Sequence, residues 1–374
     1  MFYLVGWGQK MSRQRFILKR KAFITLLIGI FILSGCGQSE NSKIDSDNLF
    51  TETEGKMKDD ENNEPSEDLP KPLEVPVNTK IEDIHYYSED YIDLLASPPL
   101  CKSDGKNIYL VDKQDFYIMP VGTDELSPAN IDIPEGMDVY NLAFDSYGRI
   151  HLLIADRDNE EYFIWRLDES YQVDKTIDIS AYVEEKQVPL WFLIHKDGTY
   201  YIQWPLNRNG IIVDSEGVLK HKFTLESLGI RWTREAAVGK DGQIYLVYGD
   251  RDEKWEIGKL DVKNCLIKNE NSSLYFPGSE IFMAMSGGTD TNLLLLSPYS
   301  GVWACDTESG IMENRVPLSD LRLGFDTESE FWLRIFLPDG RLLLLGQTVN
   351  DNNADNVDGE SSKHLLFKYI PVGK

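Results

Sequence analysis

The chain has 374 residues, of which 42% are hydrophobic and 27% are charged, and this composition suits a globular body with a sizeable core. Its formal net charge of −24 argues against a nucleic-acid partner, because the phosphate backbone is bound by clustered Lys and Arg. Six basic residues and no acidic residue precede Cys36, so the rest of the chain is more acidic than the total suggests.

Residues 1–35 are predicted to be a signal peptide. Basic residues lead into the apolar stretch AFITLLIGIFILSG, which is shorter than the roughly 20 residues of a membrane span. The sequence LSGC at 33–36 then resembles a bacterial lipobox, which implies cleavage before Cys36 and a diacylglycerol on its sulfur. An ordinary cleaved signal with a chance Cys is the alternative, and a start at Met11 instead of Met1 also leaves a complete signal.

Residues 36–76 are predicted to be a disordered, acidic tether. The segment has a single aromatic residue and is rich in Asp, Glu, Asn, Ser and Pro. Such a composition buries too little apolar surface to offset the conformational entropy lost on folding. A coil of this length spans about 35 Å, so we expect the lipid to lie well away from the folded body.

Residues 77–374 are predicted to form a β-propeller. Two apolar runs separated by a turn recur six times, with the anchoring glycines Gly105, Gly148, Gly198, Gly242, Gly288 and Gly340. A repeat of roughly 45 residues built from short apolar runs is typical of four-stranded propeller blades. We therefore predict an all-β fold with six blades of four antiparallel strands.

The fourth and sixth units show how the blades are built and closed. In the fourth unit the strands read EAAVG, QIYLVYG, KWEIGKLD and CLIKNENSS, and the last is poorest in apolar residues, as an outermost strand should be. The sixth unit ends at KHLLFKYIPV without a fourth strand. We expect a segment within LEVPVNTKIEDIHYY, at the start of this region, to supply it. If residues 76–100 instead belong to a further blade, the ring has seven.

The repeats resemble those of NHL-type propellers. The stretches DGQIYLVYGDRD at 241–252 and YGRIHLLIADRD at 147–158 are similar to the DG-x-I-Y-V-x-D core of that family, over about residues 81–374. The fifth unit departs from the core with Ser286-Gly287-Gly288, and the third lacks Asp-Arg-Asp. Together with the lipobox, the repeats resemble the propeller lipoproteins that clostridia and their relatives export. The resemblance implies a six-bladed ring on the extracytoplasmic face of a bacterial cell membrane.

No catalytic residue is predicted. The chain has no GxSxG, HExxH or Walker motif, and its five His are scattered singly. Cys101, Cys265 and Cys305 lack CxxC spacing and are expected to be buried apolar side chains. A weak calcium candidate is the loop with Asp351, Asn353 and Asp355, although Asn356 and Ser362 stand where an EF-hand needs Gly and Glu. We therefore expect no cofactor beyond the lipid on Cys36.

Acidic loops between the second and third strands of several units form the candidate binding surface. In an up-and-down ring these loops emerge on one face, opposite the Asp-Gly turns. Carboxylates beside aromatic rings suit Lys- or Arg-rich segments through ion pairs and cation–π contacts, whereas the alternative is an ordinary solvated acidic surface. The candidate binding residues are Asp156, Asp158, Tyr162, Asp250, Asp252, Trp255 and Trp303.

These features favour a monomeric, membrane-anchored propeller that binds a protein or peptide, with a cationic segment as one candidate. The alternatives are a propeller enzyme of lactonase or glycosidase type, acting from the central channel, and an accessory subunit of a transporter or cell-wall complex. An enzyme needs polar side chains on the innermost strands. These strands read mostly apolar, as in NLAF, WFLI and EAAV, so we expect a packed axis.

Overall fold

The computed structural model describes residues 82–87, 100–156, 158–183, 188–204, 209–249, 254–269, 271, 273–321, 329–348 and 364–372. All of them belong to the compact unit Glu67–Lys374. The predicted signal peptide, Cys36 and the tether lie outside the described residues. In the part of the chain that is described, no helix is long and apolar enough to cross a membrane.

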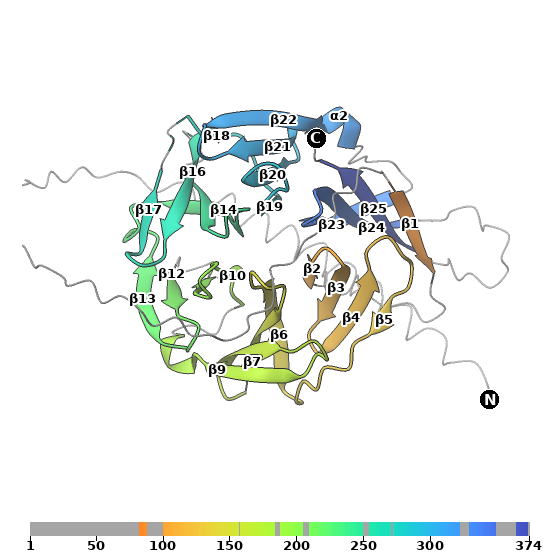
Figure 1. Ribbon diagram of the computed structural model, residues 1–374, viewed down its shortest axis with the longest axis vertical. Helices are drawn as coiled ribbons and strands as arrows, with labels where there is room; N and C mark the ends of the chain where they lie inside the picture. The colour runs from red at the N-terminus through yellow and green to blue at the C-terminus, as the bar shows by residue number, and fades with distance from the viewer. Residues whose placement is uncertain are drawn as a thin grey trace, which may run out of the picture. The chain divides into compact units, whose positions relative to one another are not determined.

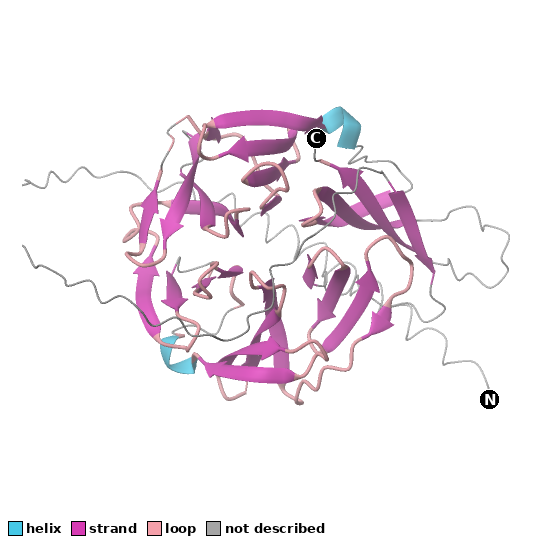
Figure 2. Cartoon of the chain, in the orientation of Figure 1, coloured by secondary structure: helices cyan, strands magenta, loops and turns pink. Residues whose placement is uncertain are grey.

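The strands form six sheets arranged as the blades of a ring (Figures 1 and 2), which confirms the predicted all-β propeller. Blade 1 contains β2 (Leu100–Ser103), β3 (Asn107–Asp112), β4 (Asp115–Pro120) and β5 (Ser127–Pro128). Blade 2 contains β6 (Met137–Phe144), β7 (Ile150–Asp156), β8 (Glu161–Leu167) and β9 (Val173–Asp178). Blade 3 contains β10 (Trp191–Ile194), β11 (Tyr200–Gln203), β12 (Asn209–Val213) and β13 (Leu219–Thr224).

The second half of the ring follows the same plan. Blade 4 contains β14 (Trp232–Val238), β15 (Ile244–Gly249), β16 (Lys254–Asp261) and β17 (Leu266–Lys268), and β18 (Tyr275–Pro277) also pairs with β16. Blade 5 contains β19 (Ala284–Ser286), β20 (Leu293–Ser297), β21 (Gly301–Asp306) and β22 (Ile311–Pro317). Blade 6 contains β23 (Ser329–Phe336), β24 (Arg341–Thr348), β25 (His364–Pro371) and β1 (Glu82–Tyr87). Two short helical turns, η1 (Ser180–Tyr182) and α2 (Leu318–Leu321), follow blades 2 and 5.

The N-terminal strand closes the ring. β1 pairs antiparallel with β25, with Ile84 opposite Phe367, and so supplies the outer strand of the last blade. This confirms the expected closure by EDIHYY and gives six blades instead of seven. Across the seam to blade 1, the Gly122 N–H donates to the Tyr369 hydroxyl over 3.3 Å.

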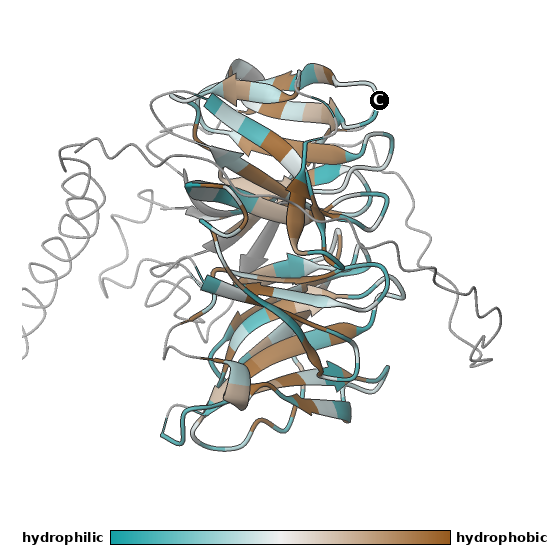
Figure 3. Ribbon diagram, turned by 90° about the vertical axis from the view of Figure 1, so that its left-hand side faces the viewer, coloured by the Kyte–Doolittle hydropathy of each residue, from teal (hydrophilic) through white to brown (hydrophobic). Residues whose placement is uncertain are grey.

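The hydrophobic cores lie between neighbouring blades. The second strands are buried on both faces, as in LLLLS of β20, because each blade packs against a blade on either side. One core joins Leu153 and Ile164 of blade 2 to Phe192 and Ile202 of blade 3. The outer strands β9 and β22 are mostly exposed, and Figure 3 shows hydrophobic residues along the strands and hydrophilic ones at many turns.

Antiparallel topology gives the ring two faces. The turn face carries the turns from first to second and from third to fourth strands, and the loop face carries the remaining connections. At most turns an Asp carboxylate accepts backbone N–H groups two to four residues onward. The Asp residues that do so are Asp104, Asp145, Asp168, Asp197, Asp214, Asp241, Asp261, Asp306 and Asp339.

The turn of blade 2 also ties two blades together. Asp145 accepts from Arg149 Nε over 2.7 Å and contacts His151 Nε2 at 3.3 Å, while Tyr200 of blade 3 lies 3.1 Å from His151 Nδ1. Burial alone would raise the pKa of Asp145, but hydrogen bonds from His151 and Arg149 outweigh it and hold the pKa at about 2. His151 and Asp145 therefore have structural roles.

Candidate functional site

The acidic loop of blade 2 connects β7 to β8 on the loop face. The carboxylate of Asp156 accepts the backbone N–H groups of Asp158 and Asn159, each over 3.0 Å, and the Asn159 amide over 2.9 Å. Hydrogen bonds from Asn159 lower the pKa of Asp156. Asp156 thus shapes its own loop, whereas the side chains of Asp158 and Glu161 are exposed to solvent.

Two of the predicted aromatic binding residues do not present their rings to a partner. Tyr162 is 4% exposed and Trp255 is 2% exposed, because both point from third strands into cores between blades. The Trp255 indole donates to the Gly278 carbonyl over 3.1 Å. Trp303 is half-buried, donates to Ser300 Oγ over 2.8 Å and packs edge-on against Phe276. Tyr162 and Trp255 do lie early in the third strands, beside the loops, but their rings are buried in the cores between blades.

Other predicted site residues fall outside the described residues, namely Cys36, Asp250, Asp252, Asp351, Asn353 and Asp355. Among the described residues, no group of three His, Cys, Asp or Glu side chains is placed to hold a metal ion. Cys101 and Cys305 are buried free thiols, and burial raises the pKa of each to about 12. Neither thiol is activated as a nucleophile.

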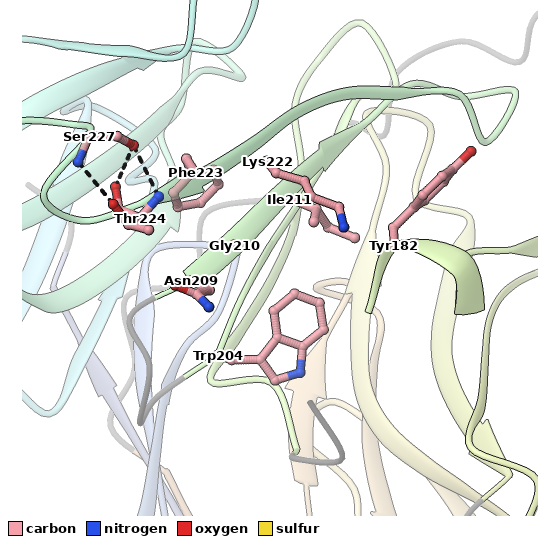
Figure 4. A pocket seen from close by; sticks show the side chains of 9 residues that line it. All are labelled: Tyr182, Trp204, Asn209, Gly210, Ile211, Lys222, Phe223, Thr224 and Ser227. Atoms are coloured by element: carbon pink, nitrogen blue, oxygen red, sulfur yellow. Dashed lines mark hydrogen bonds between the residues drawn. The ribbon is translucent and has the colours of Figure 1, made fainter. Parts of the chain in front are cut away.

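A pocket of about 320 Å³, here called the rim pocket, opens on the loop face of blade 3 (Figure 4). Trp204 follows β11, and Tyr182 comes from η1 in the connection from blade 2. Phe223 lies flat over Gly210, where a Cβ would meet its ring at 2.1 Å, so glycine makes this wall possible. The lining residues are Tyr182, Trp204, Asn209, Gly210, Ile211, Lys222, Phe223, Thr224 and Ser227.

The rim pocket and the acidic loop lie on the same face of the ring. Ser180 of η1 accepts the Tyr162 N–H over 2.9 Å, and the Ile179 N–H donates to the Tyr162 carbonyl over 2.9 Å. These bonds hold η1 against the start of β8, directly after the acidic loop. Tyr182 therefore lies near the start of β8 on the loop face, whereas Glu161 is on the opposite side of β8 from Tyr162, whose ring packs between blades 2 and 3.

The ring axis is hollow, contrary to the expected packed axis. A cavity of about 420 Å³, here called the axial cavity, is lined by the innermost strands of all six blades. Polar and apolar surface contribute comparably to its wall, and Lys102 of β2, Glu235 of β14 and Arg334 of β23 line it among many apolar side chains. Burial lowers the pKa of Lys102 and raises that of Glu235 to about 7, although the positive charges of Arg234 and Lys102 partly offset the latter shift.

The sequence did not predict the rim pocket or the axial cavity. The rim pocket joins Tyr182 to residues 20 or more positions onward, and no local pattern marks that juxtaposition. In the axial cavity, a register shift between Thr233 and Glu235 interrupts the alternation along β14, so strand periodicity could not assign the orientation of Glu235. One residue could have indicated the axial cavity. Lys102 lies in the innermost strand LCKS, where a charged side chain is expected to face either the axis or an oppositely charged partner.

No protein-family model matches the chain, and no curated protein matches it. Several solved structures are similar in fold. The virginiamycin B lyase from Staphylococcus aureus is 10% identical, with a TM-score of 0.44, over 79% of this chain and 90% of that chain. YCF48 bound to D1 peptide is 11% identical, with a TM-score of 0.42, over 79% of this chain and 99% of that chain. The PQQ-bound aldose sugar dehydrogenase from Streptomyces coelicolor is 8% identical, with a TM-score of 0.41, over 78% and 99%.

These similarities concern the fold alone, and no functional residue is carried over from them. The sheet order of the chain itself defines it as a six-bladed β-propeller.

Proposed function

We propose that this protein is a lipid-anchored binding module on the extracytoplasmic face of a bacterial cell membrane. Its partner is a protein or peptide segment that carries a basic residue beside an apolar or aromatic one. The anchor is a diacylglycerol on Cys36, and the proposal for it rests on the sequence LSGC after an apolar run.

The observation that carries the binding proposal is that the rim pocket and the acidic loop lie on the same face of the ring. The pocket is lined by the half-buried ring of Tyr182 and by Trp204 and Phe223, which are each 4% exposed, and this lining suits an apolar or aromatic side chain of a partner. The exposed carboxylates of Asp158 and Glu161 lie on the same face of the ring as this pocket and suit a cationic group of the partner. Exposed ion pairs contribute only about 0–1 kcal/mol each, so the pocket supplies most of the affinity and the carboxylates supply a salt-dependent part.

The test is capture of a partner from membranes by the full-length protein, followed by titration with variants. Tyr182→Ala should weaken binding about tenfold or more, because it removes one wall of the pocket. Tyr147→Ala is the matched control, since Tyr147 is a similarly half-buried residue of blade 2 on the turn face. Equal loss in both variants, or no loss in either, would contradict the proposed site.

A second pair of variants tests the role of charge. Asp158→Asn with Glu161→Gln should weaken binding and flatten its salt dependence. Glu169→Gln with Glu308→Gln makes the same charge change at exposed positions of the turn face and should leave binding unchanged. If the two pairs of variants behave alike, only the overall acidity of the protein matters.

The anchor is tested separately. Cys36→Ala should abolish labelling with radioactive palmitate and release the protein from membranes or leave the precursor uncleaved. A variant that still incorporates the label would show that the lipid is elsewhere.

A further inference from the structure

The axial cavity is built by all six blades. Each innermost strand lies at the end of its sheet and pairs with one neighbour only, so its second edge faces the axis. The cavity volume of about 420 Å³ is within the range of small-molecule sites. The apolar part of its wall includes Phe144, Trp191, Met285 and Phe336. Nothing in the proposed binding on the loop face uses this space.

Opposite charges face this space from opposite sides of the ring. Lys102 belongs to blade 1 and Glu235 to blade 4, and these blades lie across the axis from each other (Figure 1). Arg334 comes from blade 6, which adjoins blade 1. The cavity therefore has a cationic side, with Lys102 and Arg334, and an anionic side, with Glu235.

Lys102 and Glu235 interact electrostatically but do not form a contact pair. Within the described residues, neither side chain has a hydrogen-bond or ion-pair partner, although each charge favours the ionised form of the other. A partly buried charge without a partner is costly. Charged side chains that line a cavity without a partner, as Lys102 and Glu235 do, are candidates for ligand contacts.

The strand registers give the offset between the two charges along the axis. Tyr109 and Tyr245 occupy equivalent places, since each hydroxyl donates to the turn carboxylate of its own blade, Asp104 or Asp241. Lys102 pairs with Tyr109, and Ala237 pairs with Tyr245. Lys102 is therefore level with Ala237, two residues or about 7 Å along the strand from Glu235.

We propose that the axial cavity binds a small zwitterion with an apolar side chain, namely an amino acid or a short peptide. The carboxylate of the ligand lies towards Lys102 and Arg334, and its ammonium group lies towards Glu235. The side chain lies against the apolar wall formed by residues such as Trp191 and Met285. This ligand complements Lys102 and Glu235 at once, which neither a simple anion nor a simple cation does.

The test is calorimetric titration of the full-length protein with three probes: L-leucine, N-acetyl-L-leucine, which lacks the ammonium group, and L-leucinamide, which lacks the carboxylate. Leucine should bind at least about tenfold more tightly than either analogue. No binding of leucine at millimolar concentration, or equal binding of the three probes, would overturn the proposal. This comparison uses the parent protein and so does not depend on the folding of any variant.

Two variants then assign the groups. Lys102→Met should weaken binding of leucine and N-acetyl-leucine but not of leucinamide, whereas Glu235→Gln should weaken binding of leucine and leucinamide but not of N-acetyl-leucine. Lys106→Met is the matched control, since Lys106 is an exposed lysine at the turn face of the same blade. Variants with parental melting temperatures that bind all three probes as the parent does would place the ligand elsewhere and overturn the assignment.

Discussion

The two faces of the ring use the same residue type differently. On the turn face, Asp104, Asp145 and Asp241 accept backbone N–H groups of their own turns, and their carboxylates are committed to the fold. On the loop face, Asp156 does the same for its loop, but Asp158 and Glu161 are exposed to solvent. An acidic composition therefore does not by itself predict binding. Carboxylates that accept hydrogen bonds from the backbone must first be distinguished from those that are exposed to solvent. The carboxylates of the turn face therefore stabilise the turns of the ring, whereas those of Asp158 and Glu161 make no such contribution.

Both faces depend on a closed ring, so opening it should have the largest effect. Deletion of residues 1–87 removes β1, leaves an edge of β25 unpaired and exposes apolar blade surface. We expect loss of most of the roughly 5–15 kcal/mol of stability that a folded domain has. Deletion of residues 1–76 leaves β1 in place and should melt as the parent does. Thermal unfolding of the two truncated chains measures the difference, and equal melting temperatures would contradict closure by β1.

The next largest effect is expected from Asp145→Asn on the turn face. The change removes charge-assisted hydrogen bonds from Arg149 and weakens the link through His151 to Tyr200, so the free energy of unfolding should fall by about 2 kcal/mol. The folded pKa of Asp145, about 2, lies below its ordinary value of 3.8. Its contribution is therefore complete above about pH 4 and is lost as the pH falls through about 2.

Chemical denaturation of the parent protein and the Asp145→Asn variant at several pH values checks this prediction. The stability difference should be constant near neutral pH and shrink in acid. A difference that persists below about pH 2 would show that packing, and not the charge, makes the contribution.

A glycine pair compares backbone constraints on the two faces. Gly242 has φ +74°, and a Cβ there would meet Lys196 Cβ at 2.6 Å. Gly136, on the loop face, has φ +91° and nothing within 4 Å of the added atom. Gly242→Ala should cost about 1–2 kcal/mol from the left-handed backbone plus the cost of moving Lys196, whereas Gly136→Ala carries only the backbone cost. Urea denaturation measures both, and a larger loss for Gly136→Ala would contradict the tighter packing of the turn face.

The smallest effect on stability is expected from Asp158→Asn on the loop face. Asp158 is exposed, so the free energy of unfolding should change by less than about 0.5 kcal/mol. The same denaturation experiment measures this change. A decrease in the free energy of unfolding as large as that of Asp145→Asn would mean that the Asp158 carboxylate also stabilises the fold.

The number of blades and the closure of the ring were predictable because the sequence shows how many units there are and which strand the last unit lacks. The six turn glycines mark six units, and the sixth unit lacks an outer strand. EDIHYY at 82–87, at the start of the propeller region, was the candidate for that strand. Burial of Tyr162 and Trp255 was missed because both were assigned to the loops, although third strands also pack against the neighbouring blades. The rim pocket and the axial cavity depend on distances between strands of different blades, which no local pattern records.

The most direct test of the division between the faces is hydrogen–deuterium exchange of the full-length protein with and without its captured partner. Backbone amides in residues 158–162, 179–183 and 209–211 line or adjoin the rim pocket and the acidic loop. We expect exchange in these segments to slow on binding, while the turns at 104–107 and 239–243 remain unchanged. Protection confined to the turns, with no change beside the rim pocket, would contradict the account.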